Sequence, residues 1–194
     1  MSYPELVEKV IVVAATAALT AQAIAFSEVQ RQAIMADRYW QKGNYRPGEG
    51  PDAGLVIARM LSMITYQSEE SKELRFARRA ARQGDIVSPS GYADLGKRFD
   101  VESYLYISRA MDLYDVSEGY ASLEAALRRV RSKALFIGIR SDFLFPVPRV
   151  RRLAEQVSAV GGDATYVELD SPHGHDAFLK DWEQMNDALN VMKE

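Results

Sequence analysis

The stretch "KALFIGIRSDFLFP" (residues 133–146) decides the fold of this chain. Its first seven residues are almost all apolar, and a polar turn that contains Asp142 follows them. A short apolar run of this kind is typical of a buried strand in a parallel sheet. A helical pattern at 146–162 ends in glycine, and a second apolar strand, "ATYVEL", occupies 164–169. The order strand, helix, strand indicates a parallel sheet with a crossover helix.

A third strand is predicted near the start of the chain, within "EKVIVVAATA" (8–17), which is apolar on both alternations and therefore expected to be covered on both faces. A closing helix is predicted at 174–192, and loops at 37–54 and 86–98. Between the first two strands, helical patterns occupy 20–36, 55–68, 71–85, 99–115 and 122–132. We therefore predict an α/β fold: a parallel sheet of about three strands with crossover helices (1–20 and 120–194) and a helical lid insertion (21–119).

Within the predicted helix at 99–115, four apolar or aromatic residues recur at spacings of 3, 4 and 3: Tyr104, Ile107, Met111 and Tyr114. This spacing places them on one helical face, which we expect to be an ordinary core face rather than a ligand site.

The composition narrows the class of protein. A net charge of −3 offers no basic stripe, so nucleic acid is not an expected partner. The chain has no cysteine, which excludes thiolate metal sites and a cysteine nucleophile and fits the cytoplasm. The apolar run at 10–26 follows an acidic segment, and we interpret it as a strand and the start of a helix, not as a signal peptide or a membrane span. No metal and no bound cofactor are expected.

Two polar residues follow the predicted strands at positions where α/β sheets carry catalytic groups. Asp142 comes just after the strand at 133–139, and His175 comes just after the strand at 164–169. Serine hydrolases of the α/β type use the order serine, acid, histidine, in which the acid orients the imidazole and the imidazole takes a proton from the serine. Taken singly, Asp142 also suits a helix cap and His175 a structural hydrogen bond, but together they predict a catalytic pair. The other histidine, His173, has the weaker case.

The nucleophile of such a triad is missing from the sequence. No G-x-S-x-G motif occurs, and Ser90 in "SPSGYADLG" lies in the predicted lid rather than between a strand and a helix. Neither source of oxyanion-hole amides is present.

The chain resembles the carboxyl-terminal part of the homoserine O-acetyltransferases, which are α/β-hydrolase-fold enzymes. The resemblance runs along nearly the whole chain. It is carried by "YPELVEKVIVVAATA", "AFSEVQRQAI", "GLVIARMLSMITYQS", "RFDVESYLYISRAMDLYD", "SDFLFP" and "GHDAFL". It implies ping-pong transfer of an acetyl group from acetyl-CoA, as co-substrate, to L-homoserine in methionine biosynthesis. It also implies a homodimer formed through the lid helices.

The resemblance assigns a role to five residues. Asp142 is implied as the triad acid and His175 as the base, Asp176 binds the substrate ammonium, and Arg59 and Tyr66 hold the substrate carboxylate. The last pair makes physical sense because residues seven apart share a helical face, about 10 Å apart along the axis. Arginine also offers a bidentate fork for a carboxylate.

The resemblance further implies that about five strands, the serine and the oxyanion hole belong to an amino-terminal half that this sequence lacks. We therefore expect the chain alone to be inactive. Two alternatives stay open: a serine O-acyltransferase or succinyl-specific relative, and a non-catalytic truncated module that dimerises through its lid helices.

Overall fold

The computed structural model describes residues 2–77 and 99–193, and these form two compact units. The α/β unit comprises Met1–Ala18, Tyr66–Ser71 and Asp115–Glu194; the helical unit comprises Leu19–Thr65 and Lys72–Tyr114. The predicted loop at 86–98, Ser90 and the second half of the helix predicted at 71–85 lie outside the described residues. No helix in the described ranges combines the length and the apolar composition needed to cross a membrane.

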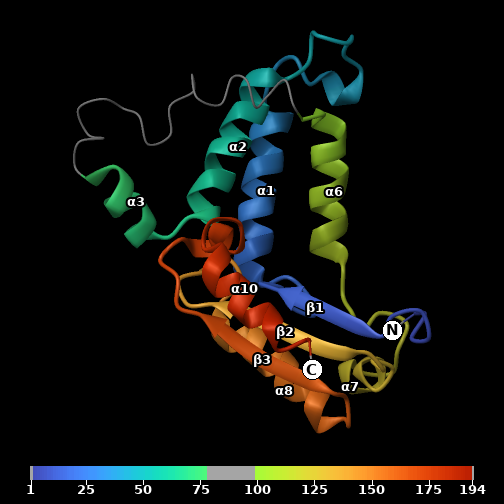
Figure 1. Cartoon of the computed structure of the whole chain (residues 1–194). Helices are drawn as coiled ribbons and strands as arrows, with labels where there is room; N and C mark the ends of the chain where they lie inside the picture. Colours follow the sequence, from blue (N-terminus) through green and yellow to red (C-terminus); the bar gives the residue numbers. More distant parts are fainter. Residues whose placement is uncertain (1, 78–98, 194) are drawn as a thin grey trace. The chain divides into compact units, whose positions relative to one another are not determined.

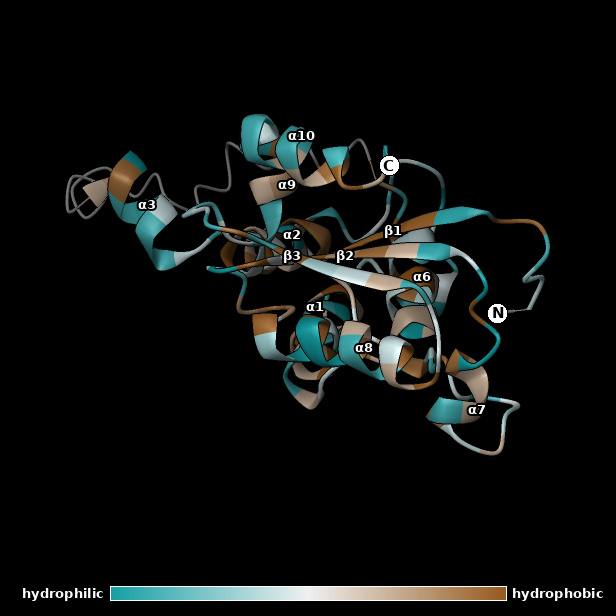
Figure 2. Ribbon diagram, turned by 60° about the horizontal axis from the view of Figure 1, so that its bottom comes forward, coloured by the Kyte–Doolittle hydropathy of each residue, from teal (hydrophilic) through white to brown (hydrophobic). Residues whose placement is uncertain are grey.

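The α/β unit contains a parallel sheet in the order β1-β2-β3, formed by β1 (Lys9–Val13), β2 (Lys133–Ile139) and β3 (Ala164–Leu169). Both later strands have the bounds that their apolar runs predict. Helices cover both faces of the sheet: α8 (Val147–Ala159) lies on one face, and α9 (Ala177–Lys180) and α10 (Trp182–Asn190) lie on the other (Figure 2). A short helix, α7 (Leu123–Leu127), precedes β2 and is capped by Ser122.

Alternate residues of β2 pack into two separate clusters, as the pleat of a strand requires. Leu135, Ile137 and Ile139 are fully buried in a cluster with residues of α9 and α10. Ala134 and Phe136 pack on the other face against the apolar stripe of α8, which consists of Val150, Leu153, Ala154 and Val157. These positions recur at the helical period, so α8 turns one face to the sheet and its arginines to solvent.

The expectation that the first strand is covered on both faces is wrong for the described residues. β1 pairs with β2 on one side only, and the side chain of Ile11 is 44% exposed. The reason is positional: α8 packs on β2 and β3, and α10 on β3, so these helices leave part of β1 uncovered.

The closing helix is also not continuous. A 3-10 turn, η4 (Gly174–Asp176), precedes α9, and the chain breaks again at Asp181, whose backbone is not helical. Aspartate is a preferred residue at the start of a helix, and Asp181 directly precedes α10. The Asp181 carboxylate accepts a hydrogen bond from the Gln184 side-chain amide at 2.7 Å.

Within the described ranges, the helical unit is built from four helices, which Figure 1 labels: α1 (Ala21–Met35), α2 (Asp52–Tyr66), α3 (Glu69–Arg75) and α6 (Val101–Leu113). A 3-10 turn, η1, lies at Gln41–Gly43. The first residues of α3 and the last of α2 belong to the α/β unit. Thr20 caps α1 and Asp100 caps α6 through side-chain oxygens. The core consists of Ile34, Leu55, Ala58, Val101 and Leu105.

The predicted core face of α6 is only partly correct, because Tyr104 packs against the core of the helical unit but the other three residues of that face are exposed. Ile107 is 61% exposed and Tyr114 is 60% exposed, and Met111 is exposed as well. The buried face begins with Val101 and Leu105 and continues with Ser108 and Asp112, two polar residues that an apolar pattern does not reveal. They face inward because the guanidinium of Arg31, buried on α1, lies 2.5 Å from the Asp112 carboxylate and 3.3 Å from the Ser108 hydroxyl. A buried charge needs such a partner.

Candidate active site

The two residues that follow β2 and β3 are in direct contact. Nδ1 of His175 lies 2.8 Å from Oδ2 of Asp142. The other carboxylate oxygen of Asp142 accepts hydrogen bonds from the backbone N–H groups of Leu144, at 2.8 Å, and Phe145, at 2.9 Å. Because α8 starts later, at Val147, with no side-chain cap, the carboxylate orders the turn and the imidazole rather than capping that helix.

The imidazole of His175 is held in one orientation. A carboxylate only accepts hydrogen bonds, so Nδ1 carries the proton and Nε2 is left as an acceptor. Three aromatic rings surround the imidazole: Phe145 is stacked at 5.1 Å between centroids, Phe178 is edge-on at 5.7 Å, and Tyr66 is tilted at 5.8 Å. Nε2 has no hydrogen-bond partner in the described part of the chain. The Asp142 side chain is fully buried, whereas that of His175 is 21% exposed. This is the arrangement of a base oriented by a buried acid.

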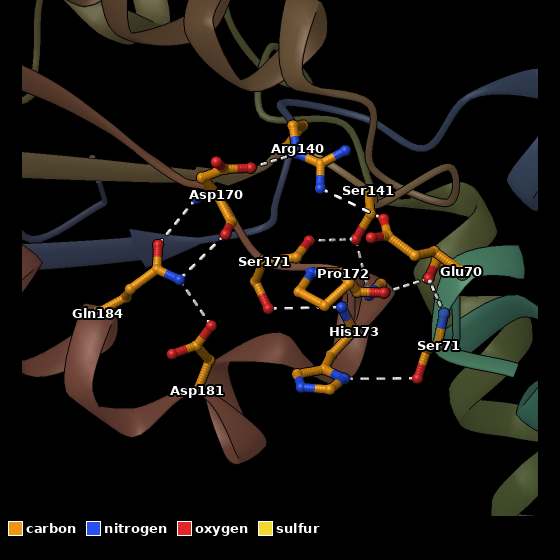
Figure 3. Close-up of polar contacts among 12 residues, drawn as sticks. Glu70, Ser71, Arg140, Ser141, Asp170, Ser171, Pro172, His173, Asp181 and Gln184 are labelled. Carbon is orange, nitrogen blue, oxygen red and sulfur yellow. Dashed lines mark hydrogen bonds and ion pairs between the residues drawn. The ribbon is translucent and has the colours of Figure 1, made fainter. Parts of the chain in front are cut away.

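The loop that carries His175, residues 170–176, is called here the histidine loop. Figure 3 shows how polar groups from other elements bind it. The Ser141 hydroxyl donates to the carbonyl of Ser171 at 2.6 Å and accepts from the N–H of Gly174 at 2.8 Å. The Ser68 hydroxyl donates to the carbonyl of Pro172. The loop is therefore anchored from the end of β2 and from the segment that follows α2.

Side chains also bind the first residue of the loop and its second histidine. Gln184 of α10 accepts from the N–H of Asp170 at 2.9 Å and donates to its carbonyl at 3.0 Å. Arg140 pairs with the carboxylate of Asp170 and, at 3.3 Å, with that of Glu70; these two partners raise its pKa above the ordinary value. Nδ1 of His173 lies 3.4 Å from the Ser71 hydroxyl, and Asp142 is not its partner. The structure thus gives the two histidines different surroundings.

Gly174, between the two histidines, has a left-handed backbone conformation that residues with a Cβ rarely adopt. Its φ is +68°, and a Cβ there would lie 2.5 Å from the Ser68 nitrogen and 2.8 Å from the Gln67 carbonyl carbon. These are backbone atoms and cannot rotate away. Glycine therefore lets the histidine loop pack directly on the segment 67–68.

We predict that Gly174→Ala lowers the free energy of unfolding of the chain by about 2–4 kcal/mol, because left-handed strain adds to steric overlap. The matched control is Gly161→Ala, since Gly161 has a φ of +90° but nothing within 4 Å of its added Cβ. That control carries the backbone strain alone, about 1–2 kcal/mol. Urea denaturation measures both, and equal losses contradict the close packing.

The other residues predicted for the site are distributed over both units. Tyr66 is the last residue of α2, belongs to the α/β unit and contacts the His175 ring. Asp176 follows His175, and its carboxylate lies 3.8 Å from the Lys180 ammonium. Arg59 is in the helical unit, where its guanidinium packs over the Phe99 ring at 4.4 Å. Its Nε is buried without a hydrogen-bond partner among the described residues.

Three residues that contact the Asp142–His175 pair or its loop were not predicted from the sequence. Ser141 stands directly before Asp142, and Phe145 and Phe178 lie within the quoted motifs "SDFLFP" and "GHDAFL". Their closeness to Asp142 and His175 in the sequence was the one feature that could have indicated these contacts. In contrast, no local pattern points to the contacts that Ser68 makes with the histidine loop.

Comparison with known proteins gives this geometry a context. No protein-family model matches the chain. A protein named homoserine O-acetyltransferase from Moorella thermoacetica is 41% identical over 194 residues, which cover 94% of this chain. A similarly named protein from Symbiobacterium thermophilum is 42% identical over 97% of the chain. The chain is homologous to the homoserine O-acetyltransferases. It spans about half the length of these curated relatives, 52% of each.

Solved structures agree on the fold. A homoserine O-acetyltransferase from Bacillus anthracis superposes with a TM-score of 0.84 at 23% identity, over 99% of this chain and 55% of that one. The esterase E22 superposes with a TM-score of 0.87, also at 23% identity, for an L374D mutant, over 99% of this chain and 56% of that one. The predicted α/β-hydrolase-type fold is therefore confirmed. Because homoserine O-acetyltransferases and esterases share it, the fold alone does not choose the reaction.

Proposed function

We propose that this chain supplies the acid and the base of a Ser-His-Asp triad to an acyltransferase that transfers acetyl from acetyl-CoA to the hydroxyl of L-homoserine. The observation that carries the proposal is the 2.8 Å contact between Asp142 and His175 at the ends of neighbouring parallel strands. Homoserine and the acetyl group come from the names of the relatives, and acetyl-CoA as the donor is what the family resemblance implies.

In the proposed reaction, Nε2 of His175 takes the proton of a serine hydroxyl as the serine oxygen attacks the acetyl carbonyl. The thioester bond breaks, and the imidazolium returns the proton to the departing CoA sulfur. His175 then takes the proton of the homoserine hydroxyl as its oxygen attacks the acyl-serine. The ester bond to the serine breaks, and the imidazolium returns the proton to the serine oxygen. Asp142 stabilises the imidazolium in both halves of the reaction. The serine comes from outside these 194 residues, because they contain no G-x-S-x-G motif.

For the acceptor, we propose that Arg59 binds the carboxylate of homoserine, together with Tyr66, and that Asp176 binds its ammonium. Two properties support Arg59: its Nε is a buried donor without a partner in the described residues, and its guanidinium is stacked on Phe99. A carboxylate would satisfy that donor. Tyr66 is supported by its contact with the His175 ring, which places the phenol beside the base.

A chimera tests the function most directly. This chain replaces the matching half of the Moorella relative, so that the part of the relative that the chain does not cover supplies the remaining strands. We expect thiol release from acetyl-CoA that depends on homoserine. A folded chimera without acyl transfer to any acceptor, alongside an active Moorella protein, contradicts the proposal and favours a non-catalytic module.

We expect Arg59→Ala in this chimera to weaken use of homoserine by about 10²-fold, the loss typical of a charged hydrogen-bond partner. Acylation by the donor should change little, because Arg59 contacts only the acceptor. Arg38→Ala is the control, since Arg38 also packs over an aromatic ring, Tyr39, in the same unit. The acylation burst and the homoserine dependence are measured separately, and a defect confined to the burst refutes this role for Arg59.

One relative favours a different acyl acceptor, serine, and a different acyl group, succinyl. A protein named serine O-succinyltransferase from Litchfieldella anticariensis is 42% identical over 94% of this chain, and the chain covers 54% of it. This identity is as high as that of the homoserine O-acetyltransferases. Assaying the chimera with acetyl-CoA and succinyl-CoA against homoserine and serine separates the two, provided that specificity follows this chain.

We also propose that the chain forms a homodimer through its helical unit. The support is the exposed apolar and aromatic side chains of α6, which include Tyr106, Ile107 and Met111. A patch of this kind on a helix is typical of protein interfaces. We expect Ile107→Asp to convert a dimer to a monomer in analytical ultracentrifugation. The control is Leu179→Asp, which changes a leucine of the α/β unit that is 69% exposed, against 61% for Ile107.

A further inference from the structure

Ser141 connects the loop of the acid to the loop of the base. It follows β2 and directly precedes Asp142, and its hydroxyl makes two hydrogen bonds to the histidine loop. It donates to the Ser171 carbonyl at 2.6 Å and accepts from the Gly174 N–H at 2.8 Å (Figure 3). One hydroxyl therefore spans the turn that ends immediately before His175.

We propose that Ser141 is a positioning residue that holds His175 against Asp142. Asp142 is already fixed by the N–H groups of Leu144 and Phe145, so it does not follow the imidazole if the histidine loop moves. The backbone before His175 depends on the Gly174 N–H, for which Ser141 is the acceptor. The Ser68 hydroxyl also binds this loop, at the Pro172 carbonyl, but the Ser141 hydroxyl binds the residue immediately before His175.

The surroundings of Ser141 leave its two backbone partners without a substitute. Ser171 is fully buried and Gly174 is buried, so water does not easily replace the lost hydroxyl. The nearby contacts of His173, its N–H to Ser171 and its ring to Ser71, are both long, at 3.4 Å. Removal of the hydroxyl would leave a buried donor and a buried acceptor unpaired, and the loop relieves this only by moving.

The sequence offers a matched control at the other end of the same strand. Ser132 directly precedes β2, and its hydroxyl donates to the Val7 carbonyl at 2.7 Å, a contact between segments 125 residues apart. It resembles Ser141 in residue type, in position beside β2 and in bonding a distant carbonyl. It differs in lying at the end of the strand away from Asp142.

The test uses the 194-residue chain labelled with ¹⁵N-histidine, because two histidines give two imidazole signals that His173→Ala assigns. In the unaltered chain we expect His175 to show the Nδ1–H tautomer and a proton that exchanges slowly with water. Ser141→Ala should exchange this proton about tenfold faster, the effect of losing one hydrogen bond, and mix the tautomers. Ser132→Ala should leave both properties unchanged.

The proposal is overturned if Ser141→Ala keeps the His175 signal, or if Ser132→Ala loses it equally. If Ser141→Ala does not fold, Ser141→Thr decides. This variant keeps the hydroxyl and should keep the His175 signal, and a folded Ser141→Thr protein that lacks the signal contradicts the role.

The significance for catalysis rests on the proposed function and is tested separately. In the chimera, Ser141→Ala should lower kcat by about tenfold or more while the KM for homoserine stays the same. An inactive chimera with the expected spectra disproves the function and leaves the positioning role intact.

Discussion

Replacing His175 with alanine in the chimera described above should lower turnover by at least about 10⁴-fold, the scale observed when a triad base is removed. His175 is the residue bonded to Asp142, and its Nε2 has no hydrogen-bond partner in the described residues. Without the imidazole, no group in the site takes the proton of the serine. Release of CoA thiol in the presence of homoserine measures the loss.

The second histidine is the control for this prediction. His173 is two positions away in the same loop, but its ring contacts Ser71 at 3.4 Å and its contacts do not include Asp142. His173→Ala should therefore retain most of the turnover. If the two variants lose activity equally, the assignment of His175 as the base is wrong, because a general disturbance of the loop then explains both.

The unaltered 194-residue chain by itself should show no acetyltransferase activity above background, although its acid and base are in contact. Its sequence has no G-x-S-x-G motif, so under the proposed function we expect His175 to have no nucleophile to activate. We also expect the oxyanion-hole amides to come from outside these residues, and each such donor is worth roughly 3–4 kcal/mol of transition-state stabilisation. Together these losses exceed what the remaining pair can offset.

The measurement compares three preparations at equal concentration: the chain, the chimera and the chimera with His175→Ala. Thiol release from acetyl-CoA should rise above background only in the unaltered chimera. Turnover by the isolated chain that survives in its own His175→Ala variant would point to a contaminant. Turnover that the substitution removes would overturn the prediction, because a nucleophile within these residues would then be required.

The sequence alone predicted the parts of the fold that depend on local pattern. β2 and β3 have the bounds of their apolar runs. For β2 the reason is that a strand buried on both faces needs apolar side chains on both. The contact of Asp142 with His175 also follows from local pattern, since parallel neighbours bring their carboxyl ends to one edge of the sheet. The family resemblance predicted the fold class that the superpositions confirm.

Tertiary structure alone decided which face of a helix is buried and what holds the base. The inward face of α6 depends on Arg31 of α1, which requires Asp112 as a partner and leaves Ile107 exposed. The anchors of the histidine loop, Ser68 and Ser141, are 104 and 33 residues away from the backbone groups they bind. Hydrophobic periodicity indicates only which face of a helix or strand is apolar, and not which distant side chain packs against that face. A hydrogen bond between distant segments depends on where the folded chain places both partners, and a single sequence carries no local signal for that.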